Sequence, residues 1–85
     1  MTELCERFEF LYGPTSPNRP DLPAYLRAQV YGRMHYMLED NAADVDTKRK
    51  RFRSAFHPDR PGIFNRDECE AVFKTIPHIF DGAEL

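Results

Sequence analysis

An imidazole and a carboxylate stand two residues apart in His57-Pro58-Asp59, with a proline between them. A histidine beside an acid can transfer protons, help to hold a metal ion, or make charged hydrogen bonds to a binding partner. Pro58 fixes its own φ and disfavours the α conformation for His57, so a helix that reaches Phe56 should end there. We therefore expect a rigid corner that carries both side chains.

Binding is favoured over the other two chemistries. The chain of 85 residues contains no convincing nucleophile or oxyanion device and is too small for an evident substrate pocket. Its histidines and cysteines lack the spacing of metal ligands. We expect no enzymatic activity, no metal and no cofactor. The tripeptide in isolation would be read as an ordinary turn, because Pro and Asp are turn residues.

A strongly basic run leads into the corner. Residues 48–60 hold six of the twelve basic residues and one acidic residue, a local charge of +5, so the rest of the chain carries −7. A cationic patch on an otherwise acidic protein indicates a localised anionic partner, although a solvated helix face is the usual alternative. The basic side chains that we expect to contact a partner are Lys48, Lys50, Arg51, Arg53 and Arg60.

Composition predicts one small globular domain outside the membrane. Hydrophobic residues make up 41% of the chain, with seven Phe and four Tyr, which is enough for a core. Cys5 and Cys69 form no disulfide framework, and Cys69 is expected to be a buried thiol. The sequence shows no signal segment and no apolar run near the ~20 residues that cross a bilayer. We expect the cytoplasm or another reducing intracellular compartment, and no secretion.

Helical periodicity predicts the elements that position the corner. A helix should begin near Asp21, with Pro23 in its first turn, and end near Glu39. A second should be capped by Asn41 and bury Val45, Phe52 and Phe56. Its Arg49 should lie at the edge of this face, with the guanidinium in water.

A third helix should carry the chain back from the corner. Asn65 and Glu68 form a capping box, and Cys69, Val72, Phe73 and Ile76 follow at helical spacing. Pro77 should interrupt this helix, with Ile79 and Phe80 packing beyond the interruption.

The N-terminal part is expected to precede this arrangement as an extension. Residues 1–20 should form an extension, with a short helix slightly favoured over a strand in residues 1–12 and a proline-rich loop after it. Residues 21–85 should form the domain itself. The expected fold is all-α: an antiparallel helical hairpin with a third packed helix.

These residues together resemble the J-domain of DnaJ-type co-chaperones. The signature of that family is a His-Pro-Asp tripeptide between two antiparallel helices, here His57-Pro58-Asp59. Residues of the flanking helices also match in type and position, across roughly residues 25–82: Val45, Phe52, Phe56, Phe73, Ile76 and Phe80, with the basic residues Lys48, Lys50, Arg51 and Arg53. Arg49, Pro77 and the N-terminal extension depart from the pattern, as in a divergent, stand-alone member.

The resemblance implies a function in protein folding. Its partner would be a DnaK-type heat-shock chaperone whose ATP hydrolysis the J-domain stimulates without performing it. Asp59 would pair with an arginine of the chaperone, Pro58 would hold the corner and His57 would orient it. The basic residues would meet an acidic groove.

Two other functions remain open at this point. The chain could be a J-like structural or adaptor subunit of a larger protein complex, without ATPase-stimulating activity, as the departures at Arg49 and Pro77 suggest. The basic helix could also bind nucleic acid. We rank nucleic acid third, because the remainder of the chain is acidic and the pI is about 5.9.

Overall fold

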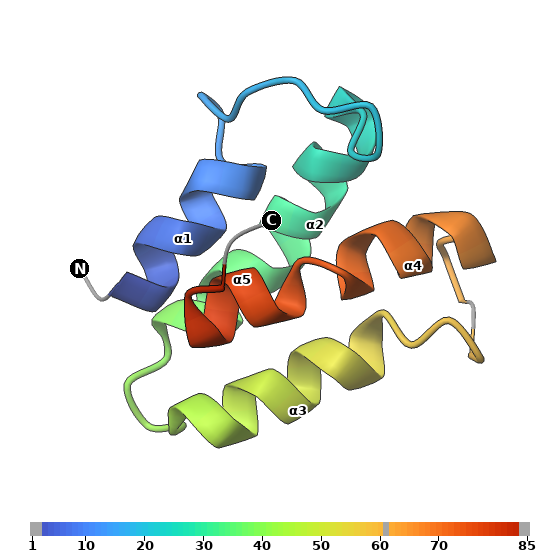
Figure 1. Ribbon diagram of the computed structural model, residues 1–85. Helices are drawn as coiled ribbons and strands as arrows, with labels where there is room; N and C mark the ends of the chain where they lie inside the picture. Colours follow the sequence, from blue (N-terminus) through green and yellow to red (C-terminus); the bar gives the residue numbers. More distant parts are fainter. Residues whose placement is uncertain (1–2, 61, 84–85) are drawn as a thin grey trace.

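Five helices make up the computed structural model, which describes residues 3–60 and 62–83 (Figure 1). They are α1 (Glu3–Tyr12), α2 (Ala24–Glu39), α3 (Val45–Ala55), α4 (Arg66–Phe73) and α5 (Ile76–Asp81). The described residues contain no strand, so the predicted all-α class is confirmed. None of the helices in this part of the chain is both long and apolar enough to span a bilayer.

The predicted antiparallel hairpin is formed by α3 and the returning pair α4–α5. Figure 1 shows α3 running toward the corner and α4 and α5 running back beside it. The arms meet through α3 and α5, and α2 packs against α3 as the third helix. Phe52 of α3 is fully buried between these layers, with its ring 5.7 Å from that of Phe80 in α5. The corner therefore sits at the tip of a hairpin whose arms pack in the core near its other end.

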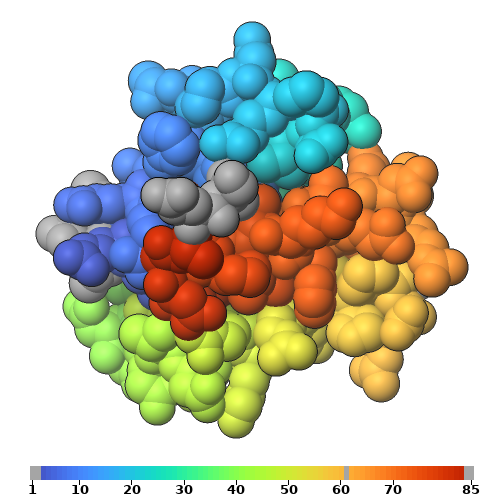
Figure 2. Space-filling model, in the orientation of Figure 1, coloured from blue at the N-terminus to red at the C-terminus, as the bar shows by residue number. Residues whose placement is uncertain are grey.

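The N-terminal helix is an integral part of the domain, which corrects the expected extension. α1 packs against both α2 and α5, and Phe8, Leu11 and Tyr12 are almost completely buried in the same core cluster. The radius of gyration is 11.9 Å, and one domain of this length should have about 12 Å. Figure 2 shows the N-terminal segment, α5 and α3 as adjoining parts of one surface. The short helix predicted for residues 1–12 is confirmed over Glu3–Tyr12.

The loop that follows α1 is also fixed to the domain. Arg27 of α2 is buried and donates hydrogen bonds to the Pro17 carbonyl oxygen and to Oδ1 of Asn18. A turn closes at its end, where the Leu22 N–H donates to the Arg19 carbonyl. Because this turn occupies the backbone up to Leu22, α2 begins three residues later than predicted, with Pro23 as its N-cap.

The caps of the two hairpin helices explain where they begin. Asp44, not the predicted Asn41, caps α3 by accepting a hydrogen bond from the Thr47 N–H, which lowers the pKa of the Asp44 carboxyl. The predicted capping box of Asn65 and Glu68 is present at α4. Hydrogen bonds from the Tyr25 hydroxyl and the Asn65 N–H lower the pKa of Glu68. Glu68 therefore joins α2 to the start of α4.

Pro77 interrupts the returning arm, as predicted. α4 ends at Phe73, Lys74 and Thr75 form a turn, and α5 begins at Ile76 with Pro77 in its first turn. A proline is tolerated there because the first helical N–H groups have no partner inside the helix. Ile79 and Phe80 pack into the core beyond the break, also as predicted. The arm is thus two short helices with a turn between them.

Candidate partner-binding surface

The corner predicted from Pro58 is a tight turn immediately after α3. The helix ends at Ala55, and Phe56 leaves the helical conformation with φ −123° and ψ 28°. The Arg60 N–H then donates to the His57 carbonyl at 3.0 Å, which closes a four-residue turn with Pro58 in its second position. Proline favours that position because its fixed φ matches the turn. The local sequence therefore accounts for the shape of the corner.

One local hydrogen bond holds the His57 side chain of the corner. The Asp59 N–H donates to Nδ1 of His57 at 3.2 Å, so the neutral imidazole accepts at Nδ1 and carries its proton on Nε2. The Asp59 carboxylate lies 3.9 Å from the same nitrogen, and its side chain is 75% exposed. The acid is directed to solvent and remains accessible to a partner.

Phe73 lies beneath the corner and joins the two arms. The His57 ring meets it edge-on at 5.8 Å between centroids, and the Arg53 guanidinium lies 5.8 Å from its centroid. An arginine over an aromatic face gains a cation–π attraction of about 0.5–1 kcal/mol at exposed sites. Phe73 from α4 thus positions one imidazole and one guanidinium that α3 and the corner supply.

Four of the five basic residues predicted to contact a partner lie on the surface. Lys50, Arg51, Arg53 and Arg60 are all exposed. Lys50 pairs with Asp46 one turn earlier at 3.2 Å, and both side chains are mostly in water, so this pair contributes little to stability. The exposed cationic residues run along α3 and continue past the turn, beside the Asp59 carboxylate.

Lys48 does not belong to this exposed face, which corrects the prediction for that residue. It is only 7% exposed, and its Nζ donates to the Leu38 carbonyl at 2.7 Å. That carbonyl lies in the last turn of α2, where helical carbonyls lack partners inside the helix and a positive charge is favourable. Lys48 therefore holds α2 against α3. Its role is structural.

The buried face of α3 accordingly differs from the one that we expected. Lys48, Phe52 and Phe56 follow one another at four-residue spacing and face inward, whereas Val45 is 49% exposed. The four-residue spacing was visible in the sequence, but a lysine at a core position becomes credible only once an acceptor for its ammonium group is known. Leu38 supplies that acceptor from another helix.

Arg49 lies at the edge of the buried face, as predicted, but its guanidinium is not simply in water. It makes a short ion pair with Asp81 of α5 and lies 5.9 Å from the centroid of the Phe80 ring. The side chain is 31% exposed. Arg49 lies in the half of α3 away from the corner, and there it links the two arms of the hairpin.

A hollow of about 570 Å³ runs between the arms next to these residues. Its charged lining residues are Arg49, which pairs with Asp81, and the cations Arg53 and Lys74. Phe73, Ile76 and Pro77 supply apolar walls. Sequence reasoning missed Lys74, because only the return of the chain at the corner brings it close to α3.

Residues 3–60 and 62–83 contain no group of three or more His, Cys, Asp and Glu side chains that could hold a metal ion. Cys69 is buried, as predicted, and burial raises the pKa of its thiol.

Comparisons of the chain with family models, with curated proteins and with solved structures found no match.

Proposed function

We propose that this protein is a J-domain-like co-chaperone that docks on a DnaK-type heat-shock chaperone and stimulates its ATP hydrolysis. The observation that carries the proposal is the exposed Asp59 carboxylate at a proline-stiffened turn, beside the cationic face of α3. The J-domain resemblance of the sequence rests on the same residues. The protein would act in the cytoplasm or another reducing compartment and would not itself be an enzyme.

Asp59 would make the decisive contact with an arginine of the chaperone. A carboxylate and a guanidinium form paired, charge-assisted hydrogen bonds, which are about twice as strong as neutral ones. The 75% exposure of the Asp59 side chain leaves its oxygens accessible for that pairing. Pro58 and the hydrogen bond between the Asp59 N–H and His57 reduce the cost of ordering the turn on docking.

Lys50, Arg51, Arg53 and Arg60 would meet an acidic surface of the chaperone. Opposite charges speed the encounter and fix the orientation, and salt weakens both effects. Docking can stimulate hydrolysis only if the chaperone arrangement that is competent for hydrolysis binds this surface more tightly than the resting one. The proposal therefore assigns Asp59 to a contact that is stronger in the activated arrangement.

Single-turnover ATP hydrolysis by a purified DnaK-type chaperone, with and without this protein, tests the proposal. We expect acceleration by the wild-type protein and none by Asp59→Asn, which removes the charge and keeps the shape. Asp40→Asn is the matched control, because Asp40 is exposed in the loop between α2 and α3 and its Ala42 contact can be kept by an asparagine oxygen. Absence of acceleration with chaperones from each compartment, or equal acceleration by Asp59→Asn, would refute the proposal.

A second candidate, an adaptor subunit of a larger complex, is supported by large apolar side chains on the surface. Tyr36 is 78% exposed, Ile63 74% and Phe10 53%. Apolar side chains in water often mark contacts between proteins, although scattered ones are common. Stable association with other proteins that Asp59→Asn leaves unchanged, without stimulation of any ATPase, would favour this function over the first.

A further inference from the structure

The three histidines of the chain differ in what protonation does to their contacts. His35 Nε2 lies 3.3 Å from a carboxylate oxygen of Glu39, and His78 Nδ1 lies 2.7 Å from the Ala83 carbonyl oxygen. An ionised carboxylate and a carbonyl oxygen only accept hydrogen bonds, so the ring nitrogen carries a proton in both contacts. A second proton on the other ring nitrogen leaves these contacts in place.

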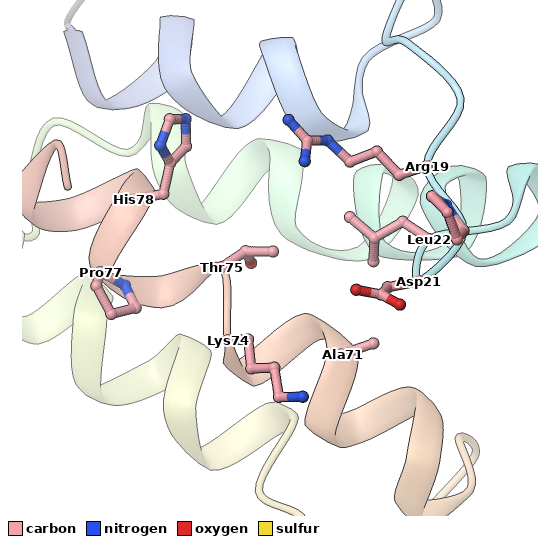
Figure 3. A pocket seen from close by; sticks show the side chains of 9 residues that line it. Arg19, Asp21, Leu22, Ala71, Lys74, Thr75, Pro77 and His78 are labelled. Carbon is pink, nitrogen blue, oxygen red and sulfur yellow. The ribbon is translucent and has the colours of Figure 1, made fainter. Parts of the chain in front are cut away.

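His78 lines a hollow of about 440 Å³, where the loop before α2 faces the junction of α4 and α5. Figure 3 shows Arg19 and Asp21 on the loop side of this hollow, and Lys74 and His78 on the junction side. The acid of the hollow, Asp21, is well separated from the His78 ring. Asp21 therefore does not compete with the Ala83 carbonyl for that ring.

The ring of His57 at the corner has the opposite arrangement, because its Nδ1 is an acceptor. The Asp59 N–H donates to this nitrogen at 3.2 Å, so Nδ1 carries a lone pair while the ring is neutral. The Asp59 carboxylate lies 3.9 Å from the same nitrogen. A donor and an acceptor of one residue thus face a single ring nitrogen, and the charge of the ring decides which of them it can bond.

Protonation of His57 exchanges one contact for the other. A proton from solvent that binds Nδ1 occupies the lone pair that the Asp59 N–H uses, so that hydrogen bond is lost. The imidazolium donates at Nδ1 instead. The Asp59 carboxylate needs to approach by about 1 Å to reach the length of about 2.7–2.9 Å that is typical of a charge-assisted hydrogen bond. Its side chain is 75% exposed, so a small rotation is enough.

The charged groups around the corner come from three elements. The cations are Arg53 of α3, which packs on the same aromatic ring as His57, Arg60 of the turn, and Lys74 of α4, which lines the adjacent hollow with Arg53. These cations disfavour a further positive charge on His57, whereas the Asp59 carboxylate attracts it. The imidazolium therefore has Asp59 as its partner of opposite charge.

We propose that the corner is a switch operated by one proton. With His57 neutral, the Asp59 N–H is bonded to the ring and the carboxylate is available to a cationic side chain of a partner. With His57 protonated, the carboxylate pairs with the imidazolium, and the corner binds such a side chain more weakly. The effect on a chaperone rests on the proposed function, whereas the exchange of contacts within the corner does not.

NMR of the whole protein between about pH 5.5 and 8 tests the exchange of contacts, because histidine changes charge in this range. The ring ¹⁵N signals should show neutral His57 with its proton on Nε2 and neutral His78 with its proton on Nδ1. The amide signals and the carboxylate ¹³C signal of Asp59 should shift with the same midpoint as the His57 ring. Below this midpoint the Asp59 N–H should exchange with water about 2–10-fold faster, relative to a short peptide of the same sequence at the same pH.

His57→Asn holds the corner in one state. An asparagine oxygen accepts the N–H two residues later, as in an Asx turn, but takes up no proton in this pH range. The Asp59 signals should therefore stay constant in this variant. His78→Gln is the matched control, because the contact of His78 does not depend on its charge, and it should leave the titration of Asp59 unchanged.

Stimulation of ATP hydrolysis at about pH 8 and about pH 6 measures the consequence for a DnaK-type chaperone. The protein concentration that gives half-maximal stimulation should rise about 2–5-fold at the lower pH for the wild type and for His78→Gln, relative to His57→Asn. The comparison with His57→Asn removes the pH dependence of the chaperone itself. If His57→Asn does not stimulate, the NMR titration decides.

Three NMR results would overturn the switch: a neutral His57 with its proton on Nδ1, Asp59 signals that do not follow the His57 ring, or an unchanged titration of Asp59 in His57→Asn. An equal change in half-maximal concentration for the wild type and His57→Asn would overturn its effect on docking. Absence of stimulation by the wild type at both pH values would instead refute the co-chaperone function, and the NMR titration would still decide the switch.

Discussion

Two prolines interrupt helices in this protein, and the two interruptions differ in their exposure to solvent. After α3, Pro58 stands in a turn that is closed by local hydrogen bonds, from the Asp59 N–H to His57 Nδ1 and from the Arg60 N–H to the His57 carbonyl, and Asp59 and Arg60 are exposed. Between α4 and α5, the turn before Pro77 places Thr75 in the core. There its hydroxyl is hydrogen-bonded to the Tyr12 hydroxyl of α1, which is far away in the sequence. Each of the two prolines lacks a backbone N–H that could continue a helix. The difference must come from the residues around them.

The residues after each proline determine whether the chain leaves the core or returns to it. Asp59 and Arg60 follow Pro58 and stay in water, so the chain leaves the core and turns. Ile79 and Phe80 follow Pro77 and are buried, so the chain returns to the core after one turn. The turn at Pro58 leaves exposed side chains accessible to other molecules, whereas the buried turn before Pro77 holds helices together. Substitutions near each proline test this contrast.

Truncating one isoleucine after each proline should give the sharpest contrast. Ile79→Ala should lower the free energy of unfolding by about 2–5 kcal/mol, because it opens a cavity at a fully buried position. Ile63→Ala, at a position that is 74% exposed, should change it by less than about 0.5 kcal/mol. Urea denaturation of both variants measures the difference. Similar losses in the two variants would mean that both interruptions bear on the core.

Removing the hydroxyl at the buried interruption should have the next largest effect. Thr75→Val leaves the buried Tyr12 hydroxyl without its partner, and an unsatisfied buried group costs about 1–3 kcal/mol. Thr15→Val, in the exposed loop after α1, is the matched control and should be nearly neutral. Thermal unfolding followed by circular dichroism compares the two. If Thr75→Val were as stable as wild type, the tie between Tyr12 and the junction would contribute nothing.

The sequence alone predicted the interruptions better than it predicted their surroundings. Proline geometry is local, so the turn at Pro58 and the break before Pro77 followed from neighbouring residues. The partners of Lys48 and Arg49 were missed because Leu38 and Asp81 are 10 and 32 residues away in the chain. Ion pairs and buried donors depend on which helices meet, and periodicity within one helix does not reveal that.

The same limit applies to the N-terminal segment and to the two surfaces. Helical spacing predicted α1, but its place in the core depends on contacts with α2 and α5 that no local pattern encodes. The exposed acid at the corner could be predicted from three consecutive residues. The cavity around Arg19 and Lys74 could not, because it forms only where the loop and the α4–α5 junction come together.

The two lysines of the basic run extend the contrast between buried and exposed groups. Lys48→Met should lower the free energy of unfolding by about 1–3 kcal/mol, because the Leu38 carbonyl loses its ammonium donor. Lys50→Met removes a largely solvated pair with Asp46 and should change it by less than about 1 kcal/mol. Urea denaturation distinguishes them. Equal effects would place both lysines on the surface and restore Lys48 to the candidate contact face.

The smallest change in stability is expected at the corner itself. Asp59→Asn removes a charge whose side chain is 75% exposed, and an asparagine also suits a turn, so the free energy of unfolding should change by less than about 0.5 kcal/mol. Urea denaturation of Asp59→Asn beside Asp40→Asn measures it. A loss of more than about 1 kcal/mol in Asp59→Asn alone would show that the carboxylate stabilises the fold. If the wild-type protein stimulates a chaperone as proposed, a stable Asp59→Asn variant without this effect would instead place the role of Asp59 in binding.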